Sequence, residues 1–166
     1  MNRYKNNFIK VLFSIFLITS VVSCDKVGEI DKEMTTTGSY AGDWYVDATG
    51  TDGVKLFEHV KHSTYNTSAN DNTMWIDDHG DGKDIKSKFT IDTGTGSFSA
   101  TNSPNLLKTG TTTTITLGQI TKDGAVSKGG RKVDKISFRV HYSSDPVGYD
   151  VIYEGHKVTG FYEDEY

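Results

Sequence analysis

Cysteine and proline are almost absent from this chain, which has one Cys, at position 24, and two Pro in 166 residues. A single cysteine excludes an internal disulfide, so burial and hydrogen bonding must stabilise the fold. No hydrophobic run is long enough to cross a bilayer as a helix. The chain has instead 17 Gly, nine Tyr, eight Phe and abundant Thr, a composition that favours strands joined by tight turns.

The N-terminus has the pattern of an export signal. Three basic residues precede an apolar stretch over residues 11–22, which is too short to be an anchor helix. Residues 21–24, Val-Val-Ser-Cys, resemble the lipobox of bacterial lipoproteins, in which the cysteine is acylated and becomes the first residue after cleavage. We therefore expect a protein that is anchored by lipid on Cys24 to a membrane of the cell envelope, most simply the outer membrane. The alternative is an ordinary secretory signal that ends in a cysteine by chance.

Three segments follow from this pattern: a signal peptide over 1–23, a lipidated tether over 24–39 and one domain over 40–166. Beyond the signal peptide, 15 Lys and Arg stand against 22 Asp and Glu. An acidic chain without a basic cluster is poorly suited to nucleic acid, whose phosphates attract positive charge. We therefore expect no nucleic-acid partner.

The domain alternates apolar and polar residues over short segments that are separated by turn signals. The clearest segments are 85–92 and 133–142, and the last predicted strand covers 156–162. The spacing predicts eight or nine antiparallel strands and no helix longer than a turn or two. Because a sheet of that length usually curls and closes, we predict an all-β fold with a single antiparallel barrel of about eight strands. A two-sheet sandwich is the alternative.

The first predicted strand opens with Gly42-Asp43-Trp44, which matches the Gly-x-Trp of lipocalins, where the Trp closes the base of the barrel. Residues 74–78, 135–138 and 155–166 resemble segments of the lipid-binding putative hydrolases, a lipocalin-like family of cell-envelope lipoproteins. This resemblance covers residues 40–166 and implies a calycin-type barrel that binds a lipid or another apolar small molecule. Lipocalins often stack a late Arg on the Trp of the first strand. Here that place falls to Lys157, which would stack more weakly.

We predict that a ligand contacts the barrel interior through residues on the inward-facing parities of the strands. The candidates are Trp44, Leu56, Phe89, Ile91, Ile115, Leu117, Phe138, Val140 and Tyr153. The alternative is that these side chains fill a solid core, because eight strands enclose just enough space for either packed side chains or one small ligand.

We predict no catalytic, metal or cofactor site. The chain has no Gly-x-Ser-x-Gly turn and, once Cys24 is acylated, no free thiol nucleophile. Asp77, His79 and Asp81 match only the first half of a calcium loop, because Lys88 stands where a bidentate Glu is needed.

Two other roles stay open. A hydrolase, as the family name suggests, would show a Ser or Asp hydrogen-bonded in a cleft to one of the five histidines, His59, His62, His79, His141 and His156. A protein that docks onto a larger envelope complex or inhibits a protease would use exposed aromatic residues such as Tyr45, Tyr65 and Tyr162.

Overall fold

The computed structural model describes residues 35–166. The predicted export signal, the lipidation site at Cys24 and residues 25–34 of the tether lie outside the described residues. Within the described range, no helix is both long and apolar enough to cross a membrane.

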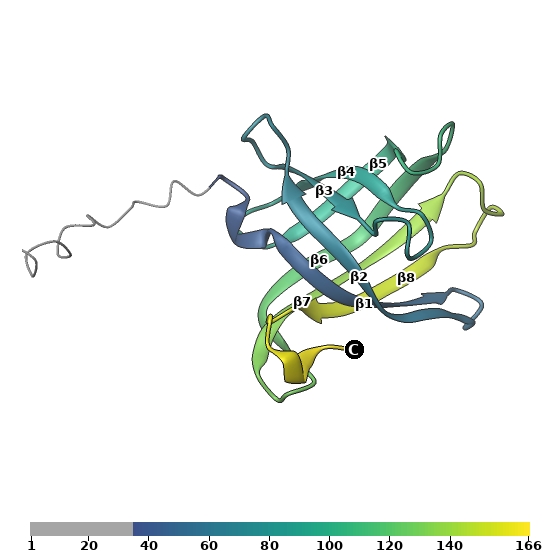
Figure 1. Ribbon diagram of the computed structural model, residues 1–166. Coiled ribbons are helices and arrows are strands. Elements are labelled where there is room, and N and C mark those ends of the chain that lie inside the picture. The colour runs from purple at the N-terminus through teal and green to yellow at the C-terminus, as the bar shows by residue number, and fades with distance from the viewer. Residues whose placement is uncertain (1–34) are drawn as a thin grey trace, which may run out of the picture. The chain divides into compact units, whose positions relative to one another are not determined.

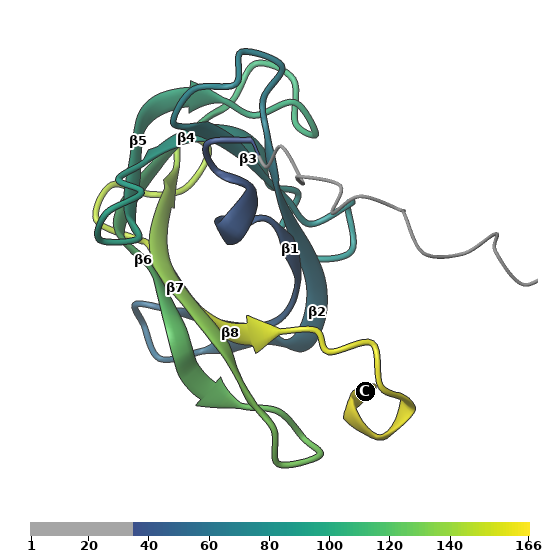
Figure 2. The same ribbon diagram turned by 90° about the vertical axis from the view of Figure 1, so that its left-hand side faces the viewer.

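Eight strands form one closed antiparallel barrel, in which each strand pairs with the next in the chain and β1 pairs with β8 (Figures 1 and 2). The all-β barrel predicted from the sequence is therefore confirmed, and the sandwich is wrong. The elements are η1 (Gly38–Tyr40), β1 (Gly42–Gly50), β2 (Lys55–Asn66), β3 (Thr73–Asp77), β4 (Lys86–Ile91), β5 (Ser97–Pro104), β6 (Thr112–Val126), β7 (Lys132–Tyr142), β8 (Val151–Lys157) and η2 (Tyr162–Asp164).

Strict alternation predicts the inward faces of β4 and β7 correctly. Phe89 and Ile91 of β4 are buried, as is the preceding Ile85, and Phe138 and Val140 of β7 are buried as well. Their polar neighbours along each strand point outward, because successive side chains of a strand face opposite sides of the sheet. One face of the barrel wall is therefore the core and the other faces solvent.

The prediction that Leu56 points into the barrel is wrong, since its side chain is 40% exposed. β2 carries one extra residue between the pairs Val46–Val60 and Ala48–Phe57, and His59 takes a φ of 55° there. This β-bulge shifts the alternation by one position, so that Phe57 rather than Leu56 packs against the core.

The prediction for Leu117 is wrong for the same reason. β6 gains a residue between the pairs Thr116–Arg139 and Gln119–Ser137, and Leu117, with a φ of 52°, is 75% exposed. Gly118 takes the inward place, where a Cβ atom would lie 2.4 Å from the carbonyl oxygen of Phe98. The bulge therefore requires a glycine beside the exposed leucine.

The C-terminal segment is not the strand predicted over 156–162. β8 ends at Lys157, and the chain then turns into η2, where Asp164 is buried. Its carboxylate accepts a hydrogen bond from the Thr159 hydroxyl at 2.5 Å and another from the Gly129 amide, and it pairs with Arg131 at 3.1 Å. These contacts, led by the Thr159 hydroxyl, lower the pKa of Asp164 to about 2. The segment is thus pinned to the β6–β7 connection.

The two ends of the barrel differ. One end carries η1 and the connections β2–β3, β4–β5 and β6–β7, and we call it the closed end. Figure 2 shows η1 inside the ring of strands. We call the mouth the opposite end, formed by the connections β1–β2, β3–β4, β5–β6 and β7–β8, of which the first and last project to the right in Figure 1.

Candidate functional site

The closed end is built around Trp44, which is fully buried. Its indole Nε1 donates to the hydroxyl of Thr64 at 2.9 Å, and that hydroxyl donates to the carbonyl of Tyr40 at 2.8 Å. The Tyr40 hydroxyl in turn donates to the carbonyl of Thr93 at 2.8 Å. This chain of hydrogen bonds ties η1 to β2 and to the β4–β5 connection.

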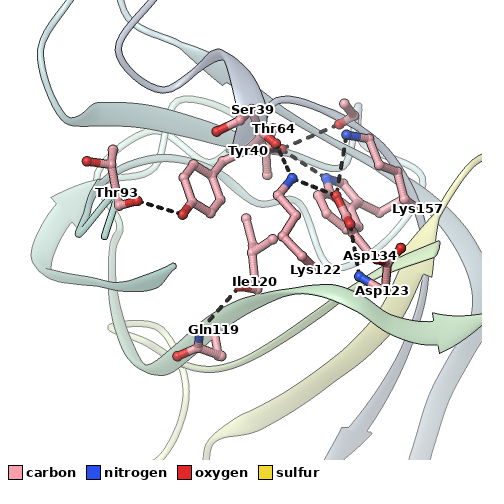
Figure 3. Close-up of polar contacts among 12 residues, drawn as sticks. Ser39, Tyr40, Thr64, Thr93, Gln119, Ile120, Lys122, Asp123, Asp134 and Lys157 are labelled. Carbon is pink, nitrogen blue, oxygen red and sulfur yellow. Dashed lines mark hydrogen bonds and ion pairs between the residues drawn. The ribbon is translucent and has the colours of Figure 1, made fainter. Parts of the chain in front are cut away.

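Lys157 covers the Trp44 ring, as the resemblance to lipocalins implied, with Nζ 5.7 Å from the ring centre. Gly42 makes room for its stem, because a Cβ atom there would lie 2.7 Å from Lys157 Cε. The Asp134 carboxylate lies 2.8 Å from Lys122 Nζ and 3.8 Å from Lys157 Nζ (Figure 3). Charges and hydrogen bonds therefore satisfy one another at this end, which leaves a structural plug rather than a ligand site.

The middle of the barrel is packed with aromatic side chains. The rings of Phe138 and Tyr153 stack with centroids 4.6 Å apart, Phe89 and Phe98 lie 4.6 Å apart, and Phe98 contacts Phe138 at 5.8 Å. Aromatic rings at these separations stabilise a fold by more than the burial of their surface area alone. This layer belongs to the continuous hydrophobic core.

The structure buries seven of the nine predicted interior residues, namely Trp44, Phe89, Ile91, Ile115, Phe138, Val140 and Tyr153. They share one core, and the two that point outward are Leu56 and Leu117. Whether a ligand touches any of the nine stays a prediction.

A buried polar cluster lies between the aromatic layer and the mouth. It consists of His62, Asp78, Tyr142 and Tyr153, all nearly or fully inaccessible to solvent. The His62 ring lies 5.8 Å from the Tyr153 ring and 5.9 Å from the Phe57 ring, and Gly82 lies against both Phe57 and Asp78. The sequence analysis assigned only Tyr153 to the interior, so three members of this cluster were missed.

The hydrogen bonds of His62 define which of its ring nitrogens carries the proton. Nδ1 lies 3.1 Å from the carbonyl of Val60, which can only accept, so Nδ1 is the donor. Burial lowers the pKa of the His62 imidazole below its ordinary value of 6.5, so the ring is neutral at neutral pH. Nε2 is therefore a lone-pair acceptor, and within residues 35–166 no hydrogen-bond donor reaches it.

Asp78 has one paired and one unpaired oxygen. Oδ1 accepts a hydrogen bond from the Gly80 amide at 3.0 Å, whereas Oδ2 is buried without a partner in the described residues. Gly82 lies directly above Oδ2, since a Cβ atom on this glycine would be 2.7 Å from it and 3.2 Å from the Phe57 ring. The loop backbone thus rests on the carboxylate itself.

The two tyrosine hydroxyls of the cluster are hydrogen-bonded to each other. Only one of the two protons is used in that bond, so the other hydroxyl proton has no acceptor among the described contacts. Burial raises the pKa of both Tyr142 and Tyr153, and both are therefore neutral at neutral pH. The cluster as a whole offers two unused acceptors and one unused donor.

Unpaired atoms of this kind lower the stability of the fold, because a buried polar atom loses its hydrogen bonds to water and gains none from the protein. Thr113, on β6 opposite Tyr142, adds another buried hydroxyl without a partner. At the closed end the described residues include one such atom, the hydroxyl of Thr37 beside η1. The fifth such atom in the described residues is Arg139 Nε on β7, so three of the five, on His62, Asp78 and Thr113, belong to the mouth side.

Residues 79–84, within the β3–β4 connection, form a lid over the polar cluster. Lys83 fastens the lid to the β7–β8 connection through an ion pair with Asp145 at 2.6 Å. Its ammonium also lies 4.9 Å from the Tyr142 ring centre and 5.1 Å from that of Tyr149. A hydrogen bond from the Asn105 side-chain amide to the carbonyl of Asp84, at 2.6 Å, also holds the lid, and both this bond and the ion pair join connections rather than paired strands.

Exposed apolar side chains surround the mouth. They lie on the β1–β2, β5–β6 and β7–β8 segments, and Val147 is fully exposed. Exposed apolar residues such as Val126 also lie toward the closed end, so those at the mouth allow the passage of an apolar molecule but do not by themselves mark a site. The rim residues are Val54, Leu56, Leu106, Leu107 and Val147.

The hydrolase alternative can be tested on Ser63, His79 and Asp77. His79 Nε2 lies 2.9 Å from Ser63 Oγ, and its Nδ1 lies 3.8 Å from Asp77. The Ser63 hydroxyl, however, donates its only proton to Asp43 at 2.6 Å. His79 Nε2 must then donate to Ser63 rather than accept from it, so it does not activate the serine. The His79 side chain is also about half exposed, although that of Asp77 is buried.

Two of the three aromatic residues suggested for protein docking are less exposed than expected. Tyr45 packs against Tyr166 with ring centres 4.9 Å apart, and the Tyr65 hydroxyl donates to Asp77 at 2.9 Å. Only Tyr162 is largely exposed, at 88%. No specific contact in the described residues favours a docking role.

The closed base and the capped mouth define a lipocalin-like barrel whose candidate ligand site is the polar cluster under the lid. The family of lipid-binding putative hydrolases matches residues 29–162, and the chain belongs to this family. No match is found among curated proteins.

Proposed function

We propose that this protein is a membrane-anchored lipoprotein that binds a lipid or another apolar small molecule at the mouth side of its barrel. Membership of a lipid-binding family and the closed barrel support lipid binding in general. The proposal adds the place of the ligand, the anchor on Cys24 and an address in the cell envelope, most simply the outer membrane.

The observation that carries the proposal is the set of buried, unpaired polar atoms on His62, Asp78 and Thr113. They lie beyond an aromatic layer and, in the case of Asp78, directly beneath the lid. A ligand that enters when the lid opens can satisfy these atoms and place its apolar part against the aromatic layer. A few polar groups in an apolar surrounding are typical of small-molecule sites.

Lipid binding is tested by extracting the purified protein with organic solvent and identifying the released molecules by mass spectrometry. We expect a lipid or other apolar molecule in stoichiometric amount, and rebinding of the extract by the delipidated protein. The matched comparison is Lys83→Glu, which breaks the ion pair with Asp145 and should speed both release and uptake. Neither bound nor rebound ligand in either protein would contradict the proposal.

The anchor is tested separately by Cys24→Ser, because the lipid attaches only through that sulfur. We expect an unprocessed or mislocalised precursor, with the barrel itself still folded. Normally processed, membrane-bound Cys24→Ser protein would contradict the lipoprotein assignment without affecting the ligand site.

A further inference from the structure

The chemistry of the polar cluster restricts the ligand's polar end. His62 Nε2 and Asp78 Oδ2 are both acceptors, so each requires a hydrogen-bond donor. The unused hydroxyl proton of the Tyr142–Tyr153 pair requires an acceptor. A head group that fits must therefore donate hydrogen bonds, and one that also accepts can pair with the tyrosine proton.

Charge decides between the common lipid head groups. A carboxylate or phosphate has acceptors only and carries a negative charge, and it would be buried beside the carboxylate of Asp78. Like charges at short range in a protein interior repel strongly, because the effective dielectric constant is low. The neighbouring charged groups do not reverse this, since Asp77 and Asp145 add negative charge, while Lys83 is paired with Asp145 and Lys86 with Asp77.

From these contacts we infer that the mouth-side site binds a lipid whose buried polar end donates hydrogen bonds and carries no negative charge, as in a long-chain alcohol, a monoacylglycerol or an alkylamine, and rejects fatty-acid anions. The hydroxyl donates to Asp78 Oδ2 or His62 Nε2 and accepts from the free tyrosine proton. An ammonium group satisfies both acceptors and is attracted by the Asp78 carboxylate, but it leaves the tyrosine proton unpaired, whereas a hydroxyl leaves one acceptor unpaired. This inference rests on the proposed function and narrows its ligand class.

The test uses decanol, decylamine and decanoate, three probes of equal chain length that differ only in the polar end. Binding of each to the purified, delipidated protein is measured by calorimetry. A hydrogen bond to a charged group contributes about 1.5–3 kcal/mol, so decanol and decylamine should each bind at least tenfold more tightly than decanoate. Decanoate that binds as tightly as decanol would overturn the inference and leave lipid binding intact.

Asp78→Asn provides the sharper variant. The amide retains Oδ1 for the Gly80 turn and replaces the unpaired acceptor by a donor. We expect decanol affinity to fall and decanoate affinity to rise, so that the ratio between them shrinks tenfold or more. The control is Asp81→Asn on the same lid, an exposed residue, which should leave the ratio unchanged.

His62→Phe keeps an aromatic ring against Phe57 and Tyr153 and removes the acceptor. It should weaken decanol binding severalfold or more without improving decanoate, and His156→Phe on the outer face is its control. If both Asp78→Asn and His62→Phe leave the ratio of decanol to decanoate unchanged, the inference is wrong. If none of the probes and no extracted lipid binds, the proposed function itself fails.

Discussion

The two ends of this barrel treat buried polar groups in opposite ways. At the closed end, the Trp44 indole, the Thr64 hydroxyl and the Tyr40 carbonyl form a continuous chain of hydrogen bonds. On the mouth side, His62 and Asp78 are as deeply buried but keep an unpaired atom each. The comparison teaches that the closed end pairs its buried polar groups, whereas the mouth side leaves buried atoms unpaired at a cost in stability, as the proposed ligand site requires.

The largest effect is expected at Trp44. Trp44→Ala removes a fully buried indole and leaves a cavity, so unfolding should become easier by about 3–5 kcal/mol. Tyr45→Ala, at the adjacent position on the outer face, should cost much less. Urea denaturation of both variants compares them, and an equal or larger loss at Tyr45 would contradict the role given to Trp44.

The next comparison uses two substitutions of equal shape, Thr64→Val at the closed end and Thr113→Val on the mouth side. Thr64→Val leaves the buried Trp44 N–H without an acceptor and should destabilise by about 1–3 kcal/mol. Thr113→Val removes a hydroxyl that has no partner and should be neutral or stabilise by about 1 kcal/mol. Urea midpoints measure both changes in stability. A change of the same sign in the two variants would contradict the contrast between paired groups at the closed end and unpaired groups on the mouth side.

The pH dependence of stability provides a smaller effect. The pKa of His62 in the folded protein lies below its ordinary 6.5, so below pH 6.5 the unfolded chain takes up a proton that the folded protein does not. Stability should therefore fall as the pH decreases from about 6.5, by at most about 1.4 kcal/mol per pH unit. Asp77, Asp134 and Asp164, whose pKa values are lowered from 3.8, add their loss only at more acidic pH.

Urea midpoints of wild type and His62→Phe between about pH 7 and pH 5 measure this contribution. The variant should lose the part of the slope that His62 contributes. A slope that is unchanged in His62→Phe would mean that His62 is already protonated or titrates equally in both states.

The smallest effect on stability is expected at the rim. Val147→Ser changes a fully exposed side chain and should alter the free energy of unfolding by less than about 0.5 kcal/mol. It should nevertheless slow the uptake of lipid by the delipidated protein, since the ligand passes this rim. Val126→Ser, an exposed valine near the closed end, is the control, and equal uptake rates in the two variants would argue against entry at the mouth.

The sequence predicts the barrel well because apolar and polar residues alternate strictly wherever a strand pairs without a bulge. Ile136, Phe138 and Val140 follow strict alternation and all are buried. Alternation fails at Leu56 and Leu117, where bulges insert a residue. Nothing in the residues themselves announces a bulge at His59, although Gly118 beside Leu117 is the kind of small residue that a bulge requires.

The candidate site was harder to predict than the fold. Strand alternation after the bulge places His62 and Thr64 inside, but their roles differ only because one finds partners and the other does not. Asp78 follows the acidic Asp77 at the end of β3, and the sequence does not distinguish the buried carboxylate from one in a solvated turn. Burial of Asp78 is a consequence of how the lid folds back over β2, which depends on the whole barrel.

The most direct test of the account is a nitrogen-15 NMR titration that follows the Nε2 atom of His62 and the indole Nε1 of Trp44. Before ligand is added, His62 Nε2 should show the resonance of an unprotonated nitrogen without a hydrogen bond. Addition of decanol to the delipidated protein should move this resonance toward that of a hydrogen-bonded nitrogen, while the Trp44 resonance stays in place. A ligand-induced shift at Trp44 with no change at His62 would contradict the assignment of binding to the mouth side.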